Sequence, residues 1–141
     1  MPRWSTSSTF EAAGVTAGAV WERAYADAPA WPRWNGALAS AEPEGPFEAG
    51  TRVRVRFRTG LRLRFTLTEV EAECVFTDES RLPGATMGHR HELEPTSDGV
   101  RLDNTIYIEG PLALVWGAVL GPPAKRGLPG WQRAIADLAR A

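Results

Sequence analysis

Residues 51–69 read TRVRVRFRTGLRLRFTLTE, and this stretch decides the fold. Large apolar residues alternate with arginine or threonine on both sides of Thr59-Gly60, which is typical of a β-hairpin with one buried face. Opposed side chains of a hairpin share a face. The pattern therefore predicts a short, odd-numbered loop centred on Gly60, and it pairs Phe57 with Leu63, Val55 with Phe65 and Val53 with Leu67.

The same register aligns arginines on the outer face, with Arg58 beside Arg62 and Arg56 beside Arg64. We expect glutamates of the next segment, residues 69–79, to balance them. An anion-binding or RNA-binding patch is the alternative. The near-neutral balance of 16 basic and 17 acidic residues, and the lack of interleaved aromatic residues, favour a solvated face over nucleic-acid binding.

Further strands are expected over residues 4–10, 73–79, 88–94 and 100–109, with a short edge strand within 41–50. A second hairpin follows from the turn at Ser97-Asp98-Gly99. Matching Leu93 with Leu102 places Glu94 opposite Arg101 outside, and His91 opposite Asn104 inside.

Helices are expected after the first strand and at the end of the chain. Thr16 is a predicted N-cap for a helix that ends at Pro29, and Ala30-Trp31-Pro32-Arg33-Trp34-Asn35-Gly36 suits a single short helix. The C-terminal helix opens at Gly110-Pro111. We expect an interruption at Gly121-Pro122-Pro123 and a core-facing stripe made of Leu112, Val115, Trp116, Val119 and Leu120, continued by Leu128, Trp131, Ile135 and Leu138.

The length of 141 residues fits one domain spanning 1–141. Hairpin strands with helices at the two ends of the chain indicate an α+β fold. We predict a curved antiparallel sheet of six to seven strands around a long C-terminal helix, with two short helices after the first strand. Such a sheet leaves an apolar space beneath the helix, which is the general form of a small-molecule site.

Several functional classes are disfavoured. The single cysteine, Cys74, rules out an internal disulfide and a cysteine-cage metal site, and we expect it to be a small core residue in a strand. His89 and His91 have a chelating spacing but lack further ligands, so no metal and no cofactor is predicted. No signal peptide or apolar stretch of membrane-spanning length is seen, which predicts a cytoplasmic protein. Arginine replaces lysine except at Lys125, as is typical of GC-rich bacterial genomes.

The chain resembles the polyketide cyclase/dehydrase and lipid-transport (SRPBCC, START-like) superfamily over essentially its whole length. The resemblance is carried in order by Val20-Trp21, Ala30-Trp31-Pro32-Arg33-Trp34, Gly50, His91-Glu92-Leu93, Asp98-Gly99-Val100-Arg101-Leu102, Ile108-Glu109-Gly110-Pro111-Leu112 and Gly127-Leu128-Pro129. It implies a helix-grip fold with a deep hydrophobic cavity whose mouth lies near the short second helix and the hairpin loops. It does not imply one reaction.

Three functions follow as hypotheses: binding of a small hydrophobic ligand (a lipid, polyketide or related metabolite), a cyclase/dehydratase-type enzyme, or a structural or interaction domain with a filled core. In the enzyme, His91 is the expected acid or base and Asn104 its orienting partner. No nucleic-acid partner is expected, and the sequence leaves the oligomeric state open. The predicted mouth consists of Trp31, Trp34 and Leu61, and the predicted cavity lining consists of Val53, Val55, Phe57, Leu63, Phe65, Leu67, Phe76, His89, His91, Asn104, Ile106, Leu112, Trp116 and Leu120.

Overall fold

The computed structural model describes residues 2–140. Within them, one antiparallel sheet has the strand order β1-β7-β6-β5-β4-β3-β2. Its strands are β1 (Arg3–Ala13), β2 (Leu38–Pro43), β3 (Arg52–Phe57), β4 (Arg62–Glu71), β5 (Val75–Leu82), β6 (Ala85–Pro95) and β7 (Gly99–Glu109). The helical elements are α1 (Ala17–Val20), the π-helix η1 (Trp21–Tyr25), the 3-10 helix η2 (Ala28–Ala30), α2 (Trp31–Trp34) and α3 (Ala113–Arg140).

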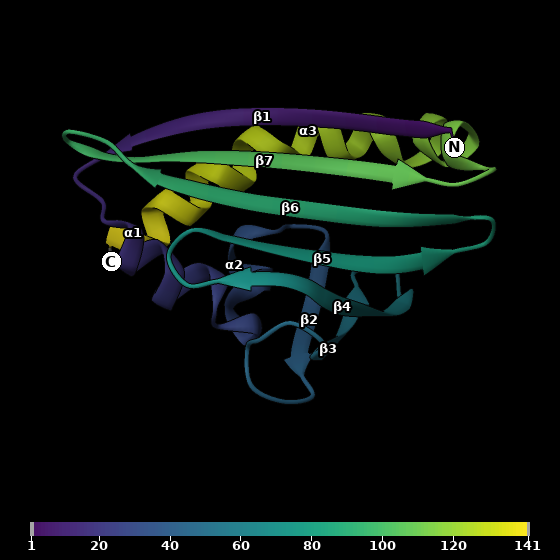
Figure 1. Cartoon of the computed structure of the whole chain (residues 1–141), viewed down its shortest axis with the longest axis horizontal. Helices are drawn as coiled ribbons and strands as arrows, with labels where there is room; N and C mark the ends of the chain where they lie inside the picture. Colours follow the sequence, from purple (N-terminus) through teal and green to yellow (C-terminus); the bar gives the residue numbers. More distant parts are fainter. Residues whose placement is uncertain (1, 141) are drawn as a thin grey trace.

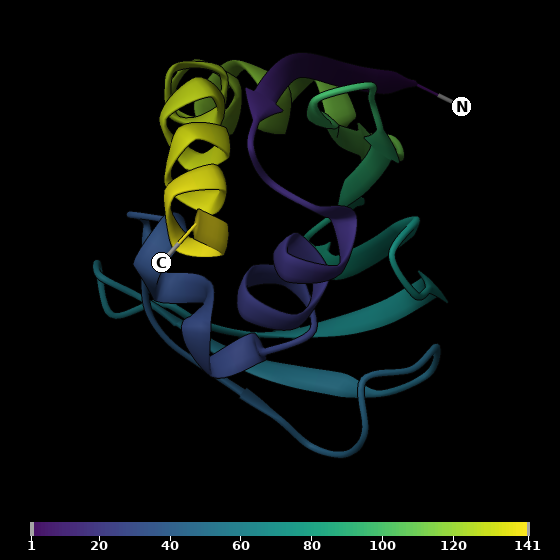
Figure 2. The ribbon, with the colours of Figure 1, turned by 90° about the vertical axis from the view of Figure 1, so that its left-hand side faces the viewer.

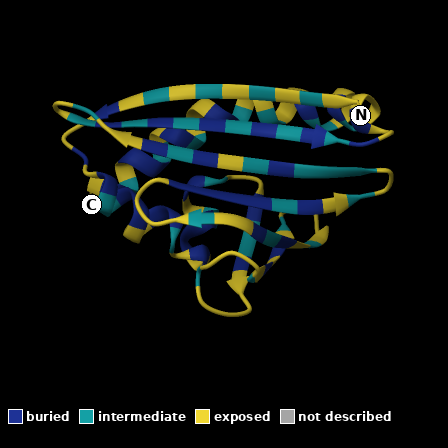
Figure 3. Cartoon of the chain, in the orientation of Figure 1, coloured by how far each residue is buried: buried dark blue, intermediate teal, exposed yellow. Residues whose placement is uncertain are grey.

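The sheet bends around the helices, as Figures 1 and 2 show. The long helix α3 packs mainly against β1 and, to a smaller extent, against α2 and β7. The short helices that follow β1 lie beside the C-terminal part of α3 and cover the inner face farther along the sheet (Figure 2). Burial alternates along β7 and, more weakly, along β1, so one face of each strand meets the core and the other meets solvent (Figure 3). The predicted α+β helix-grip architecture is confirmed.

The β3–β4 hairpin has the predicted parity but not the predicted register. Val55 pairs with Leu63 and Val53 with Phe65, which is a shift of two residues. The cause is a tight three-residue turn in which the Phe57 amide donates to the Leu61 carbonyl oxygen. Gly60 closes this turn at a φ of 96°, a conformation that glycine adopts without strain. Gly60 is therefore the last residue of the turn and not its centre.

Arginines do face one another on the outer side of the β3–β4 hairpin, but the glutamates that pair with them are not those of residues 69–79. Arg54 pairs with Arg64 across the hairpin, and Arg56 pairs with Arg62. Glu44 lies 3.2 Å from Arg64 and 3.7 Å from Arg54, and Glu42 lies 3.0 Å from Arg54. The acids thus come from β2 and the residue after it, and not from the segment after the hairpin, whose Glu69 binds Arg90 instead.

The β6–β7 hairpin confirms the predicted register. Leu93 pairs with Leu102, and His91 pairs with Asn104. The Glu94 and Arg101 side chains form an ion pair on the outer face. The predicted Thr16 cap is also confirmed, because its hydroxyl accepts from the Ala19 amide at 3.1 Å. Cys74 is corrected: it lies exposed in the β4–β5 turn and not inside a strand.

The long helix α3 runs without a break from Ala113 to Arg140, so the expected interruption at residues 121–123 is wrong. Each of the three prolines inside the helix removes one hydrogen bond to the carbonyl four residues earlier. Those carbonyls belong to Ala118, Val119 and Lys125, all of which are exposed. Water can therefore satisfy the freed oxygens on the outer side of the helix.

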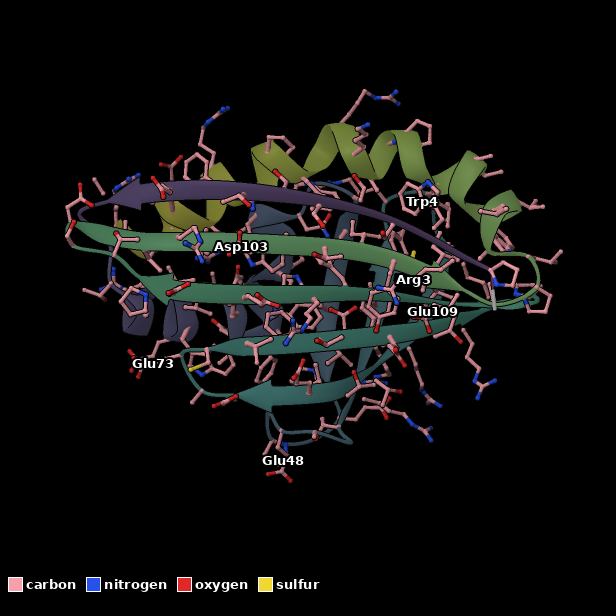
Figure 4. All side chains as sticks on the ribbon, turned by 45° about the horizontal axis from the view of Figure 1, so that its top comes forward. Arg3, Trp4, Glu48, Glu73, Asp103 and Glu109 are labelled. Atoms are coloured by element: carbon pink, nitrogen blue, oxygen red, sulfur yellow. The ribbon has the colours of Figure 1, made fainter. Side chains whose placement is uncertain are left out.

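In the first half of α3, the face that meets the sheet is made of small residues and not of the predicted stripe, whereas Leu128 and Ile135 in the second half are buried as predicted. Ala113, Gly117 and Gly121 are buried, whereas Leu112, Val115 and Val119 are 43%, 60% and 61% exposed. The indole of Trp4 on β1 occupies the space above the two glycines (Figure 4 labels Trp4 beneath α3). Side chains at these helix positions would collide with Trp4, so the glycines set the distance between α3 and β1.

Replacing Gly117 by alanine tests this close approach. The new Cβ would lie 2.5 Å from Cγ of Trp4, so we expect a loss of about 1–3 kcal/mol in the free energy of unfolding, even though alanine favours helices. The matched control is Gly130→Ala in the same helix, where nothing lies within 4 Å of the added Cβ. It should stabilise the protein by up to about 1 kcal/mol. Urea unfolding of both variants measures the contrast, and equal changes would contradict the packing argument.

Candidate ligand-binding site

Polar side chains gather on the inner face of β5, β6 and β7. Strand pairing places Asp78 opposite His89, and Phe76 opposite His91, which in turn lies opposite Asn104. Directly paired residues share a face, so these side chains belong to one inner surface. Asp78, His91 and Asn104 are buried, at 7%, 1% and 2% exposure. Buried polar groups in an otherwise apolar interior mark this region as the candidate site.

The two histidines have different partners. The His89 Nε2 atom lies 3.0 Å from the amide oxygen of Asn104. Nδ1 of His91 lies 3.3 Å from the Phe76 carbonyl oxygen, which only accepts, so Nδ1 donates. Of the two partners foreseen for His91, the amide and a backbone carbonyl, the structure has the carbonyl. The imidazoles stack on each other with ring centroids 3.7 Å apart.

Three buried polar atoms in this cluster have no hydrogen-bond partner among residues 2–140: the Tyr25 hydroxyl, His91 Nε2 and Asn104 Nδ2. Tyr25, on η1, is fully buried, and its ring centroid lies 5.3 Å from that of His91. An unpaired buried polar atom costs free energy unless something binds it. A cluster that served only the stability of the core would not be expected to leave these three atoms without hydrogen bonds.

Burial keeps these groups uncharged near neutral pH. Desolvation lowers the pKa of His89 to about 4, and burial together with His89 holds the pKa of His91 well below 6.5. Burial also raises the pKa of Tyr25 above its ordinary value, although the Asn104 amide, which does not reach hydrogen-bond geometry, offsets part of the rise. Burial and the charge of Glu79 raise the pKa of Asp78 to about 8.

Aromatic rings pack around the polar cluster. Phe76 stacks on His91 with centroids 4.0 Å apart, and Trp31 stacks on Phe76 at 5.7 Å. Trp31 and Trp34, expected at a cavity mouth, are instead 2% and 4% exposed, and their indole N–H groups donate to backbone carbonyls of η1. They are core residues because α2 turns both indoles inward. Leu61, expected at the same mouth, directly follows the β3–β4 turn and is 54% exposed.

The predicted lining residues fall into three groups. Leu112 is exposed, so it lies outside the interior, where its side chain lies close to Gly84 in the β5–β6 turn. A second group is half-buried and consists of Phe57, Leu63, His89, Trp116 and Leu120. The remaining group is buried and consists of Val53, Val55, Phe65, Leu67, Phe76, His91, Asn104 and Ile106.

Sequence reasoning missed Tyr25 and Asp78, and it placed Trp131 on the core-facing stripe of the last helix without assigning it to the site. Tyr25 lies four residues after Trp21, which puts both on one helix face. Asp78 lies two residues after Phe76, so the strand period places it inward, although its charge suggests the surface. Trp131, whose ring centroid lies 6.2 Å from that of His89, reaches the site only through tertiary packing.

Other possible sites are less complete. No group of three or more metal-ligating side chains is found within residues 2–140. One open depression of about 560 Å³ lies beside the arginines of β3 and β4, and another of about 530 Å³ lies between β1 and α3 near Lys125 and Arg126. Neither includes the polar cluster. In the described part of the chain, no helix has the length and apolar character needed to cross a membrane.

Replacing Asp78 by asparagine tests the buried carboxyl. Between about pH 4 and pH 8 the carboxyl of Asp78 is ionised in the unfolded chain but protonated in the folded protein. The contribution of this group therefore makes the free energy of unfolding fall by up to about 1.4 kcal/mol for each unit by which the pH rises. Asparagine removes that contribution. Relative to wild type, Asp78→Asn should therefore gain stability as the pH rises from 5 to 8 in urea unfolding.

Glu48→Gln, a change at an exposed carboxyl in the β2–β3 loop, is the matched control and should follow the wild-type profile (Figure 4 labels Glu48). A pH-independent difference between Asp78→Asn and wild type would show that Asp78 ionises normally in the folded protein.

Solved structures with this fold come from distant proteins. Norcoclaurine synthase from Thalictrum flavum, in complex with dopamine and hydroxybenzaldehyde, is 18% identical, with a TM-score of 0.72 over 97% of this chain and 86% of that one. A hypothetical protein from Helicobacter pylori gives a TM-score of 0.78 at 15% identity, over 96% and 88%. Ara h 8.0201 gives 0.74 at 14% identity, over 98% of both chains.

Among curated protein sequences, none matches this chain. The model of the family described as polyketide cyclase/dehydrase and lipid transport matches residues 3–141, in agreement with the helix-grip fold. The chain therefore belongs to the polyketide cyclase/dehydrase and lipid transport family.

Proposed function

We propose that this protein binds a small hydrophobic molecule between the inner face of the sheet and α3. One observation carries the proposal: apolar side chains of both layers remain only half-buried. On the sheet these are Phe57, Leu63 and Met87, which share the inner parity of their strands, and on the helix they are Trp116, Leu120 and Trp131. Covering apolar surface is worth about 25 cal/mol per Å² before ordering costs, so a ligand there would gain affinity by burial.

The helix residues form one flank of α3. Trp116 and Leu120 are four residues apart, and Trp131 follows Leu120 by three helical turns, so the three side chains point in similar directions. Trp131 lies near His89 of β6, which ties this flank to the polar cluster. Membership of a lipid-transport and cyclase family supports the proposal, as does the aromatic complex of the norcoclaurine synthase structure.

A cyclase/dehydratase-type reaction with His91 as acid or base is the second candidate. It is favoured by the Nε2 atom of His91, which has no hydrogen-bond partner in the described part of the chain. However, acid–base catalysis works best when the pKa lies near the working pH, and burial holds the pKa of His91 well below 6.5. A weakly basic, uncharged imidazole is better suited to accept a hydrogen bond than to shuttle a proton. Binding is therefore the better supported function.

The third candidate, a domain with a filled core, is favoured by the ring packing around Phe76. It predicts no saturable uptake of any apolar molecule. Binding of a neutral apolar fluorophore therefore separates it from the proposed function.

Titration with N-phenyl-1-naphthylamine tests ligand binding. We expect saturable fluorescence enhancement, with quenching of the protein's tryptophans. Leu120→Gln, which puts an amide on the half-buried flank of α3, should weaken binding about tenfold, because it removes roughly 1.4 kcal/mol or more of apolar contact. Val119→Gln, one residue earlier and 61% exposed, is the matched control and should bind as wild type does.

Equal losses in the two variants would place the probe on the outer surface of α3. Failure of the wild type to bind the probe, and of a panel of neutral lipids and aromatic compounds to protect the protein against thermal unfolding, would overturn the proposed function.

A further inference from the structure

The three unpartnered atoms of the polar cluster lie within one small region. His91 and Asn104 are directly paired across β6 and β7, and the Tyr25 ring lies 5.3 Å from that of His91. The Asn104 amide is a near neighbour of the Tyr25 hydroxyl, and it offsets part of the rise that burial causes in the pKa of the phenol. All three side chains are buried, at no more than 2% exposure. Strands β6 and β7 and the π-helix η1 thus bring one set of unpaired polar atoms to the same place.

The hydrogen bonds already made decide what each free atom offers. Because Nδ1 of His91 donates to the Phe76 carbonyl, the uncharged ring presents a lone pair at Nε2. Because the Asn104 oxygen accepts from His89, the amide presents only N–H donors at Nδ2. The Tyr25 hydroxyl can donate or accept. The cluster therefore offers one obligate acceptor beside one obligate donor.

We infer that the polar end of the ligand is a hydroxyl group, as in an alcohol, an enol or a phenol. This inference rests on the proposed function. A hydroxyl donates its proton to Nε2 of His91 while its oxygen accepts from Nδ2 of Asn104, which satisfies both atoms at once. Tyr25 supplies a further bond to the same oxygen.

Other polar ends fit less well. A ketone accepts from Asn104 but has no proton for His91, so Nε2 stays unpaired. A carboxylate also lacks that proton, and it would bring a charge into an interior without a counter-charge, because no lysine or arginine is among the buried residues of the described chain. Asp78, the one buried carboxyl of residues 2–140, would repel an anion when ionised. The site should therefore reject fatty acids.

Displacement of N-phenyl-1-naphthylamine by matched compounds tests the inference. We use 1-decanol, 2-decanone and decanoate as one series, and 2-naphthol, 2-acetylnaphthalene and 2-naphthoate as another, with decane and naphthalene as apolar references. In at least one series we expect the hydroxyl compound to bind about tenfold more tightly than the ketone, and the carboxylate to bind more weakly than either. This comparison uses the wild-type protein and needs no variant.

Two variants assign the selectivity to its atoms. His91→Phe keeps the stacking on Phe76 but removes the acceptor, and Asn104→Leu removes the donor. Each should cut the affinity for the hydroxyl compound about tenfold while leaving the hydrocarbon reference unchanged, and His91→Phe should abolish the preference over the ketone. Ser80→Ala, a buried hydroxyl on β5 outside the cluster, is the control and should keep the preference.

The outcomes separate the two proposals. If the probe binds but the hydroxyl compound, ketone and carboxylate displace it equally, ligand binding stands and the inference is overturned. If both variants fold, as judged by circular dichroism, and keep the wild-type selectivity, the inference is also overturned. If neither the probe nor any compound binds, the proposed function itself fails.

Discussion

The contact between Trp4 and the glycine face of α3 sets the geometry on which the site depends. Gly117 and Gly121 let the helix settle directly on the indole, which places α3 over β1 and β7 at one side of the sheet. A helix fixed there covers only part of the curved inner face. The strands farther along are covered by the short helices and by aromatic side chains, and Phe57 and Leu63 on their inner face stay half-buried. The partly open inner surface is thus a consequence of where two glycines allow the helix to rest.

Much of the sheet could be predicted from alternation alone. The β6–β7 register followed from matching Leu93 with Leu102, and it placed His91 opposite Asn104 correctly. The β3–β4 register did not, because a shift of two residues preserves every face and leaves the apolar pairs equally well matched. Only the turn at Gly60 distinguishes the two registers, and its conformation is a local backbone property that the apolar pattern does not contain.

The features that sequence reasoning missed depend on contacts between distant segments. The apolar stripe of the first half of α3 looks like a core face, yet Val115 and Val119 face solvent because Trp4 requires small residues opposite it. The Asn104 amide bonds His89 and not His91, which lies directly opposite it. Which of the two imidazoles the amide reaches depends on side-chain rotamers and on the stagger between the strands. Helical period could have flagged Tyr25, and strand period Asp78, but their meeting on one surface is a property of the tertiary fold.

Charged side chains lie on the outer surface, and the titratable side chains of the interior are uncharged near neutral pH. Outside, arginines and glutamates form ion pairs along the strands, including Arg3 with Glu109 (Figure 4). Inside, burial shifts the pKa of each titratable group toward its neutral form: down for His89 and His91, up for Tyr25 and Asp78. The polar groups that remain act through hydrogen-bond direction and not through charge. In the function that we propose, such an interior would distinguish ligands by where they carry protons and lone pairs, because no lysine or arginine is buried among residues 2–140.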